Sequence, residues 1–486
     1  MPTSSAPRLF LLCFFALLSH SHFSAARPHH LRLSAEDVAT VEAALPARHL
    51  AKAKTTFFEV NRPLHPPRGS SGPCSTLLLS QSFALTLNKP PVTTAYSPPS
   101  CLSGGGDVSL AVLEWRADCH GVQYDRRPGG VTWSVHKDVT KYASLLAAGN
   151  STLAVYLGNL IDDTYNGVYY ANLTLHLYFR RKAQLTSADS SPADLIVPVS
   201  RSLPLDDGLW FVVQNKTDVE STRVAVPANA YRAVLEVYVS SHYSDEFWYM
   251  NTPDQNGPFR EVTVLLDGDV VGAVWPFPVI YAGGINPLIW RPITSIGSFN
   301  LPTYDIELTP FLGKLLDSKE HEVGFAVTNA QNSWYVNGNL HLWLDPKGSP
   351  TTGGLISYDA PKLSGSITAH SVDGIDGEYQ ATASRNISAT GWVSSSQRLK
   401  RRVEIGFVES YAGAGGAGTS TLRNEQVAEA EVVLRDDQVA GASWRMHQVY
   451  NYGASNGGCY LRNVTSVGYD VLFDHNVASC TGTRRR

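Results

Sequence analysis

Residues 112–127 read VLEWRADCHGVQYDRR, and the expected fold is built around them. The stretch opens as a β-strand and passes through Cys119. Directly after Tyr124 it places an acid beside a base, Asp125 and Arg126. A loop that presents such a pair needs a rigid frame of neighbouring strands. The strand-forming patterns in much of the remaining chain predict a β-sandwich as that frame.

A second acidic turn, residues 244–249 (SDEFWY), lies in what we interpret as a second sandwich. We hypothesise that Asp125 and Glu246 meet across a cleft and share one hydrolysis. Taken alone, each acidic turn has an ordinary interpretation. Asp125 with Arg126 is typical of a surface turn, and Phe247 with Trp248 is typical of a loop anchor.

Size and composition exclude several classes of function. The chain has 486 residues, of which 43% are hydrophobic and 17% charged. It fits about three domains of ~150 residues each, with cores large enough to fold. The net charge of -4 gives no reason to expect nucleic acid or an anionic membrane as a partner.

The N-terminus has the pattern of a secretory signal peptide. Arg8 precedes the apolar run 9–18, and small residues at 24–26 suit cleavage after Ala26. The run is too short for a membrane span, which needs ~20 residues, so we expect no stable membrane anchor. We expect a secreted protein or one of the vacuole or endomembrane lumen. Glycosylation sequons agree with this, at Asn150, Asn172, Asn215, Asn386 and Asn463.

The cysteines predict disulfides but do not assign them all. Cys459 and Cys480 lie close together at the C-terminus, and we expect them to pair. Once the signal peptide is removed, Cys74, Cys101 and Cys119 remain, and an odd number cannot all pair with one another. Their spacing and the lack of partnering histidines argue against zinc. We expect neither a metal nor an organic cofactor.

Local patterns place helices and strands along the chain. Residues 34–45 have a Ser N-cap and an apolar face, which predicts a helix. Residues 262–275 contain two apolar runs around Asp-Gly, which predicts a β-hairpin. Residues 173–179 alternate in polarity as a half-buried strand does, and 89–106 is rich in Pro, Ser and Gly and predicts a loop.

One weak internal repeat supports two domains of similar topology. The order strand, Thr-started turn, Leu-Leu, turn, strand occurs after Thr140 and again after Thr309. Each Thr is expected to cap a one-turn helix.

The predicted fold class is all-β, with two tandem jelly-roll-like antiparallel β-sandwiches followed by a smaller β-rich C-terminal domain. The predicted boundaries are a signal peptide at 1–26, an N-terminal helical segment at 27–54, sandwiches at 55–200 and 201–345, a linker at 346–363 and the last domain at 364–486.

Many short runs, in order, resemble the plant peptide–N-glycosidase A family of N-glycan amidases. They are Phe58-Glu59-Val60 with Arg62-Pro63, Pro73-Cys74, Pro98-Pro99 before Cys101, Leu113-Glu114-Trp115, 121–126, Trp133-Ser134-Val135 with 137–140, 290–293, 304–311 and 459–465. As a set, motifs in this number and order are highly specific, and they extend over nearly the whole chain after the signal peptide.

The resemblance implies a reaction and roles for its residues. The reaction is hydrolysis of the amide that joins an Asn side chain to the first N-acetylglucosamine, with N-glycopeptides or denatured N-glycoproteins as substrates. Asp125 would be the principal acid/base group, Glu246 would position or activate water, and Arg126 would orient the sugar or stabilise charge. Further substrate contacts are expected from Tyr124, Trp248 and Asp245.

The bacterial N-glycanases, which the chain also resembles, have a further Glu that has no counterpart here, because Gly158 and Asn159 fall where it would be, with Asp162 and Asp163 close by. The chain also departs from the family pattern after Arg127, where a strand and a Thr-rich loop are missing. The alternative hypothesis is therefore a non-catalytic glycan-binding β-sandwich protein, an inactive variant that lacks this segment. A two-carboxylate glycosidase is a third hypothesis. The basic run 399–402 suggests processing into two chains or a solvated strand end.

Overall fold

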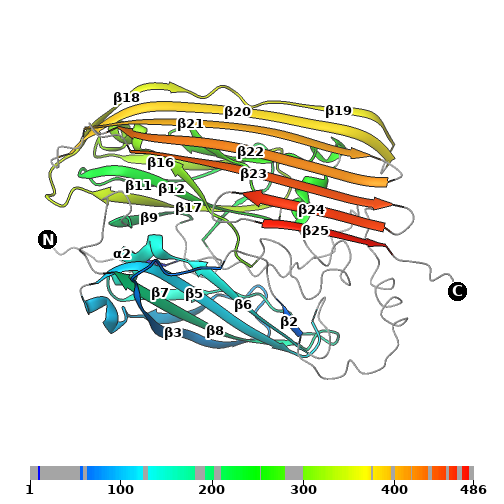
Figure 1. Cartoon of the computed structure of the whole chain (residues 1–486), viewed down its shortest axis with the longest axis horizontal. Coiled ribbons are helices and arrows are strands. Elements are labelled where there is room, and N and C mark those ends of the chain that lie inside the picture. The colour runs from blue at the N-terminus through cyan, green and yellow to red at the C-terminus, as the bar shows by residue number, and fades with distance from the viewer. Residues whose placement is uncertain are drawn as a thin grey trace. The chain divides into compact units, whose positions relative to one another are not determined.

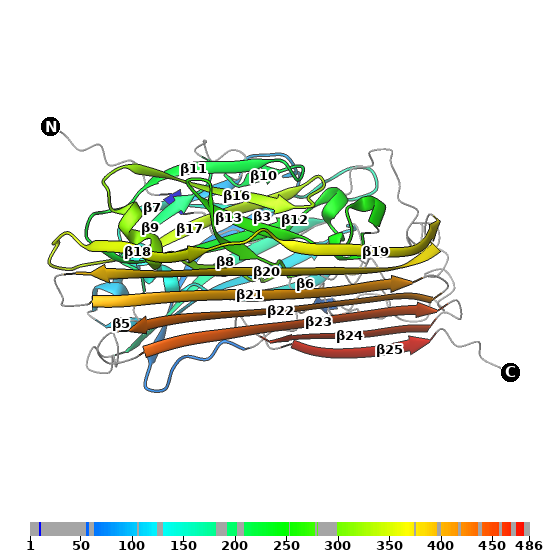
Figure 2. The same cartoon turned by 90° about the horizontal axis from the view of Figure 1, so that it is seen from above.

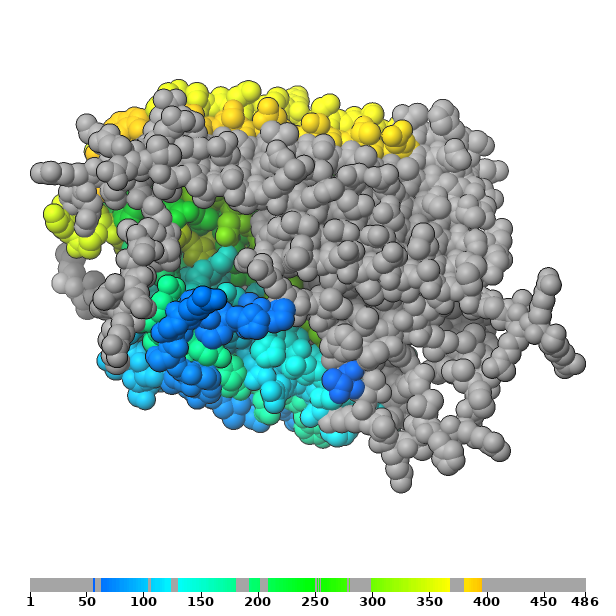
Figure 3. Space-filling view, in the orientation of Figure 1, coloured from blue at the N-terminus to red at the C-terminus, as the bar shows by residue number. Residues whose placement is uncertain are grey.

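The structure is a computed structural model. It describes residues 9–10, 55–57, 63–104, 106–123, 130–180, 192–201, 209–251, 253–277, 279, 299–373, 376–395, 400–416, 419–435, 440–455, 459–467 and 473–480. Side chains are described for most of these residues up to 367 and for 380–395, coloured in Figure 3. The predicted helix at 34–45 and the residues Tyr124, Asp125 and Arg126 lie outside the described residues.

The chain forms two compact units. The first contains Met1–Pro192, Leu203–Gly208 and Val279–Leu301, and the second contains Ala193–Ser202, Leu209–Pro278 and Pro302–Arg486. The described part of both units is mostly β, in largely antiparallel sheets with few helices, which confirms the predicted class at this level. No helix among the described residues combines the length and apolar character needed to cross a bilayer.

The described residues of the first unit form two sheets. The five-stranded sheet has the order β2 (Thr55–Phe57), β6 (Val131–Asp138), β5 (Asp107–His120), β8 (Val168–Arg180) and β3 (Ser71–Phe83), as labelled in Figure 1. The three-stranded sheet has the order β1 (Leu9–Phe10), β7 (Ser151–Val155) and β4 (Val92–Tyr96). Strand β5 contains most of the stretch 112–127 and pairs on both sides, with β6 and β8, so the predicted strand is confirmed at the centre of its sheet.

Polarity decides which face of the five-stranded sheet is buried. Along β8 the exposed residues Tyr170 and Asn172 alternate with the buried residues Tyr169, Ala171 and Leu173. This is the period of two expected for a strand with one face on the core. Strand β4 was not expected, because its β-branched sequence VTTAY lies inside the Pro- and Ser-rich segment predicted to be a loop.

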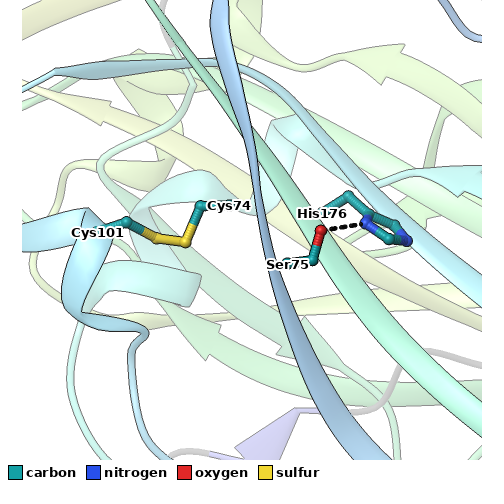
Figure 4. The surroundings of a disulfide bond; sticks show 4 residues. All are labelled: Cys74, Ser75, Cys101 and His176. Atoms are coloured by element: carbon teal, nitrogen blue, oxygen red, sulfur yellow. Dashed lines mark hydrogen bonds between the residues drawn. A yellow bond between two sulfur atoms is a disulfide. The ribbon is translucent and has the colours of Figure 1, made fainter.

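A disulfide fixes one edge of the first unit. Cys74 on β3 is bonded to Cys101 in the 3-10 helix η1 (Ser100–Gly104), as Figure 4 shows. Cys119 lies outside this bridge and is fully buried. The structure thus makes the assignment among Cys74, Cys101 and Cys119 that the sequence left open.

The second unit contains two sheets that pack face to face. One has β10 (Phe211–Val213), β17 (Trp334–Leu344), β12 (Ala230–Ser241) and β15 (Tyr304–Glu307) in order, with β9 (Leu195–Val199) also on β17. The other has β11 (Val219–Ala225), β16 (Glu320–Thr328), β13 (Glu261–Leu266) and β14 (Asp269–Val274). Across the core the rings of Phe211 and Phe325 lie 6.0 Å apart. A Cβ at Gly272 would meet Ile306 at 2.5 Å, so the sheets also approach closely there.

An eight-stranded antiparallel sheet belongs to the same unit. Its order, visible in Figure 2, is β18 (Thr352–Asp359), β20 (Asp376–Ser394), β21 (Lys400–Gly416), β22 (Thr419–Arg435), β23 (Ala440–Ser455), β24 (Cys459–Val467) and β25 (Phe473–Cys480), with β19 (Ser364–Asp373) paired to β20. Strand β18 lies inside the predicted linker 346–363. The register places Cys459 opposite Cys480, and their bond stays a prediction.

The internal repeat is present in both units. Its members are β6, η2 (Thr140–Tyr142), α2 (Ala143–Ala147) and β7 in one, and β15, η8 (Thr309–Phe311), α5 (Leu312–Leu315) and β16 in the other. The predicted caps are wrong, because neither Thr side chain caps its helix. Instead each hydroxyl accepts a backbone N–H from a central strand, Thr140 from Ala111 at 2.9 Å and Thr309 from Ala233 at 3.0 Å.

Candidate functional site

The turn predicted to carry the main catalytic acid connects β5 to β6, and both of its ends are described. Where the chain leaves β5, the Gln123 side chain donates to Asn159 Oδ1 at 2.6 Å. It also donates to the carbonyl oxygens of Leu160 and Gly167 at 2.8 and 3.0 Å. Gln123 is buried, so these bonds hold the backbone immediately before Tyr124 in the core.

Two glycines make the ends of this turn sterically specific. Gly121 has a φ of +105°, and a Cβ there would lie 2.7 Å from Asn166 Oδ1. Gly130 has a φ of +84°, and a Cβ there would lie 2.8 Å from the Cys119 carbonyl oxygen. Only glycine adopts these backbone angles without strain at such contacts. The chain therefore leaves and re-enters the sheet at fixed points.

Asn159 lies at the position for which the sequence offered no matching acid, and the structure gives it a structural role. It is fully buried, and its Nδ2 donates to the carbonyl oxygens of Phe83 and Gly167, both at 2.9 Å. With Gln123 on its Oδ1, the amide joins three segments of the first unit. Nearby Asp162 accepts the backbone N–H groups of Thr164 and Tyr165, as a turn-forming Asp does.

The second acidic turn follows β12 in the second unit. It consists of η5 (Tyr243–Asp245), Glu246, Phe247 and η6 (Trp248–Met250). Backbone hydrogen bonds tie its start to the segment before β17, between His242 and Ser333 in both directions and from Ser244 to the Asn332 carbonyl oxygen. The turn is therefore anchored to the sheet on which β12 and β17 already pair.

Asp245 is the centre of a buried hydrogen-bond network. Both it and Arg260 are fully buried. Arg260 donates to the carboxylate twice, from Nη2 at 2.6 Å and from Nε at 2.8 Å. The other donors are Asn251 Nδ2 at 3.0 Å, the Gln331 backbone N–H at 2.8 Å and Trp334 Nε1 at 2.6 Å. A buried charge is tolerated when it is paired and its remaining lone pairs are filled, as they are here.

The two acidic residues of the turn, Asp245 and Glu246, differ in how far they are exposed to solvent. Asp245 and Trp248 lie inside the unit, with exposed fractions of 0% and 1%. Glu246, between them, is partly exposed. The Trp248 ring packs against Trp334 at 6.2 Å and Tyr249 at 5.8 Å between ring centroids. Of the acidic residues predicted here, Glu246 is thus the one whose side chain reaches the surface.

A partly buried histidine lies at the start of the same turn. The His242 ring is 4.1 Å from that of Tyr335, and its Nε2 is 2.9 Å from Ser240 Oγ. Burial lowers the pKa of His242 to about 4. The imidazole is therefore neutral through the mildly acidic range and adds no charge beside the turn.

Comparisons with known proteins decide the family. Residues 63–361 match the family described as peptide N-acetyl-beta-D-glucosaminyl asparaginase amidase A. The chain is also 42% identical to peptide-N4-(N-acetyl-beta-glucosaminyl)asparagine amidase A of Prunus dulcis over 541 aligned positions, which cover 88% of this chain and 93% of the relative. The chain belongs to the amidase A family.

The amidase A match spans both acidic turns, at 124–126 and 244–249, and ends before most of the eight-stranded sheet. The 541 aligned positions exceed the 486 residues of the chain, so the almond amidase A carries internal segments that this chain lacks. This agrees with the expectation that the chain lacks a segment. The position of that segment, after Arg127, stays a prediction.

The first unit of this amidase A member also carries a polar cluster that the sequence did not reveal. His176 Nδ1 lies 2.8 Å from Ser75 Oγ (Figure 4), and its Nε2 lies 3.0 Å from Glu114 Oε2. Burial alone would raise the pKa of Glu114, but hydrogen bonds from Arg116 and His176 lower it. These residues come from three adjacent strands, and we interpret the cluster as cross-strand support.

Arg260 and its partners were also missed by the sequence interpretation. The sequence does contain one signal for Arg260, which is its place directly before the apolar strand β13. A charged side chain drawn into the core beside such a strand needs a buried partner of opposite charge. Glu261 gives the same signal and pairs with Arg385 of β20, whose Nε lies 2.9 Å from Glu261 Oε2. Among the residues that the structure describes, no cluster of His, Cys, Asp and Glu is arranged to hold a metal ion.

Proposed function

We propose that the chain hydrolyses the amide bond between an Asn side chain and the first N-acetylglucosamine of N-glycopeptides, releasing the glycan and leaving Asp. The observation that carries this proposal is the match to amidase A, at 42% identity over 88% of the chain. The substrates are N-glycopeptides or denatured N-glycoproteins, in which the peptide around the linkage is extended enough to enter a site.

The reaction needs a base for water, an acid for the leaving nitrogen and a donor for the developing oxyanion. We assign Asp125 as the principal acid/base group and Glu246 as the group that positions or activates water. Arg126 orients the sugar or stabilises charge, and Tyr124 contacts the substrate. Partial exposure of Glu246 supports its assignment, and the anchored ends of the first turn support that of Asp125.

We assign Asp245 and Trp248 a positioning role in place of the direct substrate contact predicted from the sequence. Both side chains are buried, and a side chain inside the core acts on a substrate only through its neighbours. Asp245 is joined to Arg260 and Trp334, and it directly precedes Glu246. The network thus fixes the backbone from which the Glu246 carboxylate projects.

The proposal also includes the sandwich topology of the two units, the cellular location and the processing of the chain. The face-to-face sheets of the second unit support a jelly-roll-like sandwich there, and the internal repeat extends this topology to the first unit. We place the protein in the secretory pathway, as a secreted, vacuolar or endomembrane-lumen enzyme without a stable membrane anchor. The basic run 399–402 is the place where processing would produce a two-chain form.

A second candidate function is favoured by one observation. The almond amidase A has internal segments without counterparts here, and loss of a strand beside Asp125 would leave a protein that binds glycans without cleaving them. Binding and cleavage differ in one measurable outcome, which is whether the glycopeptide remains intact after it has bound.

Substitution of the two acids tests the proposal. We expect Asp125→Asn and Glu246→Gln to lower glycopeptide turnover by roughly 10²–10⁴-fold, the usual contribution of acid/base groups. Asp163→Asn is the matched control, because Asp163 is exposed in a turn of the first unit. Near-full turnover by a folded Asp125→Asn variant would contradict the assignment. Binding without cleavage by the unsubstituted chain would favour the second candidate.

A further inference from the structure

The outward face of the five-stranded sheet in the first unit contains a groove of about 680 Å³. This volume lies within the ~300–1,000 Å³ typical of small-molecule sites. Its lining includes Ser80, Ser82, Arg116, Asp118, Tyr170 and Asn172. The groove is open, is formed by neighbouring strands and combines polar with apolar surface, as a site for a sugar ring does, because such a ring has C–H faces and polar edges.

Strand register brings these side chains together in two adjacent rows. Asn172 of β8 lies between Arg116 of β5 and Ser80 of β3. One step along the same face, Tyr170 lies between Asp118 and Ser82. Because residues i and i+2 of a strand project from the same face about 7 Å apart, the two rows form one continuous surface.

The groove contains a glycosylation sequon, Asn172-Leu173-Thr174. Leu173 is buried at 1% exposure and faces the core, so Asn172 and Thr174 face outward. Asn172 is exposed, and within the described part of the chain its side-chain amide makes no hydrogen bond. The acceptor nitrogen is thus available for modification.

Tyr170 supplies a surface on which a sugar ring can pack. It is 49% exposed, which is high for an aromatic residue, and among the described ring contacts it makes one T-shaped contact, with His120, at 5.5 Å between ring centroids. One face of an N-acetylglucosamine ring presents C–H groups, and its contact with an aromatic ring removes apolar area from water. Arg116 and Asp118 lie beside this ring and match the hydroxyl and N-acetyl groups at the sugar's edges.

We propose that Asn172 carries an N-glycan whose first sugars lie in this groove, stacked on Tyr170 and hydrogen-bonded by Arg116 and Asp118. In the modification, the Asn172 amide nitrogen bonds to C1 of an oligosaccharide on a lipid diphosphate donor. The C1–O bond to the diphosphate breaks, and the amide loses one proton as the lipid diphosphate leaves. The proposal requires passage through the secretory pathway.

The other described sequons provide an internal contrast. Asn150, Asn215 and Asn386 are exposed, and none of them lines the groove. The Asn215 Oδ1 accepts the backbone N–H of Thr217 at 2.9 Å in a surface turn. A glycan on Asn215 would project into solvent, whereas the glycan on Asn172 would lie on the sheet.

The test compares glycan release at individual sites. The full chain, secreted from a eukaryotic host, is treated in its native state with an endoglycosidase that cuts between the first two N-acetylglucosamines. Site-resolved mass spectrometry follows each sequon. We expect release from Asn172 at least about tenfold slower than from Asn215, a ratio that equals about 1.4 kcal/mol of shielding, and equal rates after denaturation.

Variants in the groove make the test specific. Tyr170→Thr and Arg116→Gln, both at exposed positions, should bring release at Asn172 to the rate at Asn215, while Tyr156→Thr, at an exposed tyrosine outside the groove, should not. An unmodified Asn172, or equal native rates at Asn172 and Asn215, would overturn the proposal. Because the endoglycosidase is added, the result is independent of amidase activity in the chain. Release by an amidase would be recognised as conversion of the Asn to Asp, and faster conversion at 172 than at 215 would also overturn it.

Discussion

Removing the charge of Arg260 should destabilise the second unit more than any exposed charge change there. The Arg260→Met variant keeps an unbranched, though shorter, side chain but leaves the Asp245 carboxylate fully buried without its cation. Three neutral donors remain, from Asn251, Gln331 and Trp334. Breaking one side of a buried ion pair costs about 3–5 kcal/mol.

That free energy converts into a measurable shift in melting temperature. For a domain of this size, 1 kcal/mol corresponds to ~2–4 °C, so we expect Tm to fall by roughly 6–20 °C in differential scanning calorimetry. Lys319→Met is the matched control, since Lys319 is 78% exposed in its ion pair with Asp317. Exposed pairs contribute only about 0–1 kcal/mol.

A double-variant cycle separates the pair from general damage. Combined with Asp245→Asn, Arg260→Met should cost less than the sum of the single changes, with a coupling of roughly 1–3 kcal/mol. Arg260→Lys keeps the charge but loses the two-point contact, and we expect kcat to fall while KM changes little. A Tm for Arg260→Met within about 2 °C of that of the unsubstituted chain would refute the reasoning.

Three further predictions concern the stability of the two units. Gly121→Ala should lower the stability of the first unit by about 1–3 kcal/mol, measured by thermal unfolding, because alanine is strained at a φ of +105°. Cys101→Ser should cost about 3.5 kcal/mol for a sequence separation of 27, seen as earlier unfolding in denaturant titrations. Burial alone would lower the pKa of His321, but hydrogen bonds to Asp267 and Asp317 raise it above 6.5, so its stabilisation is complete below pH 6.5 and is lost as pH rises through the raised value. His321→Gln should therefore flatten the fall in Tm measured from about pH 6 to about pH 8.

Asp267, which forms a hydrogen-bonded cluster with His321 and Asp317, sets the stability of this region at low pH. Burial raises its pKa, but hydrogen bonds from His321, the Glu322 backbone and Lys314 lower it to about 2. Stability from this carboxylate is present above its ordinary pKa of 3.8 and is lost as pH falls through about 2. If Tm of His321→Gln fell as steeply between about pH 6 and about pH 8 as that of the unsubstituted chain, the assignment of this pH dependence to His321 would be contradicted.

Features that depend on nearby residues were predictable from the sequence. The hairpin of β13 and β14 was predicted from Asp267-Gly268, and both residues have positive φ, 49° and 87°, as its two-residue turn requires. The strand at 173–179 was likewise predicted from its period of two and is confirmed by buried Leu175 and Leu177. Local backbone preferences and burial patterns are present in the sequence itself.

Features that depend on distant residues were not predictable in this way. Asp245 and Trp334 are hydrogen-bonded partners far apart in the chain, and nothing local in either identifies the other. The same holds for Gln123 with Asn159, where a residue at the position of an expected acid supports a backbone. The Cys74–Cys101 bridge was one of several pairings that the sequence allowed.

Hydrolysis of an N-glycopeptide in heavy-oxygen water tests the central claim most directly. The purified chain is incubated with the glycopeptide at mildly acidic pH, and the peptide is analysed by mass spectrometry. The account predicts a released peptide in which Asn has become Asp carrying one heavy oxygen, because the attacking water supplies that atom. A peptide that keeps an N-acetylglucosamine on Asn, or an intact glycopeptide in the presence of folded protein, would contradict it.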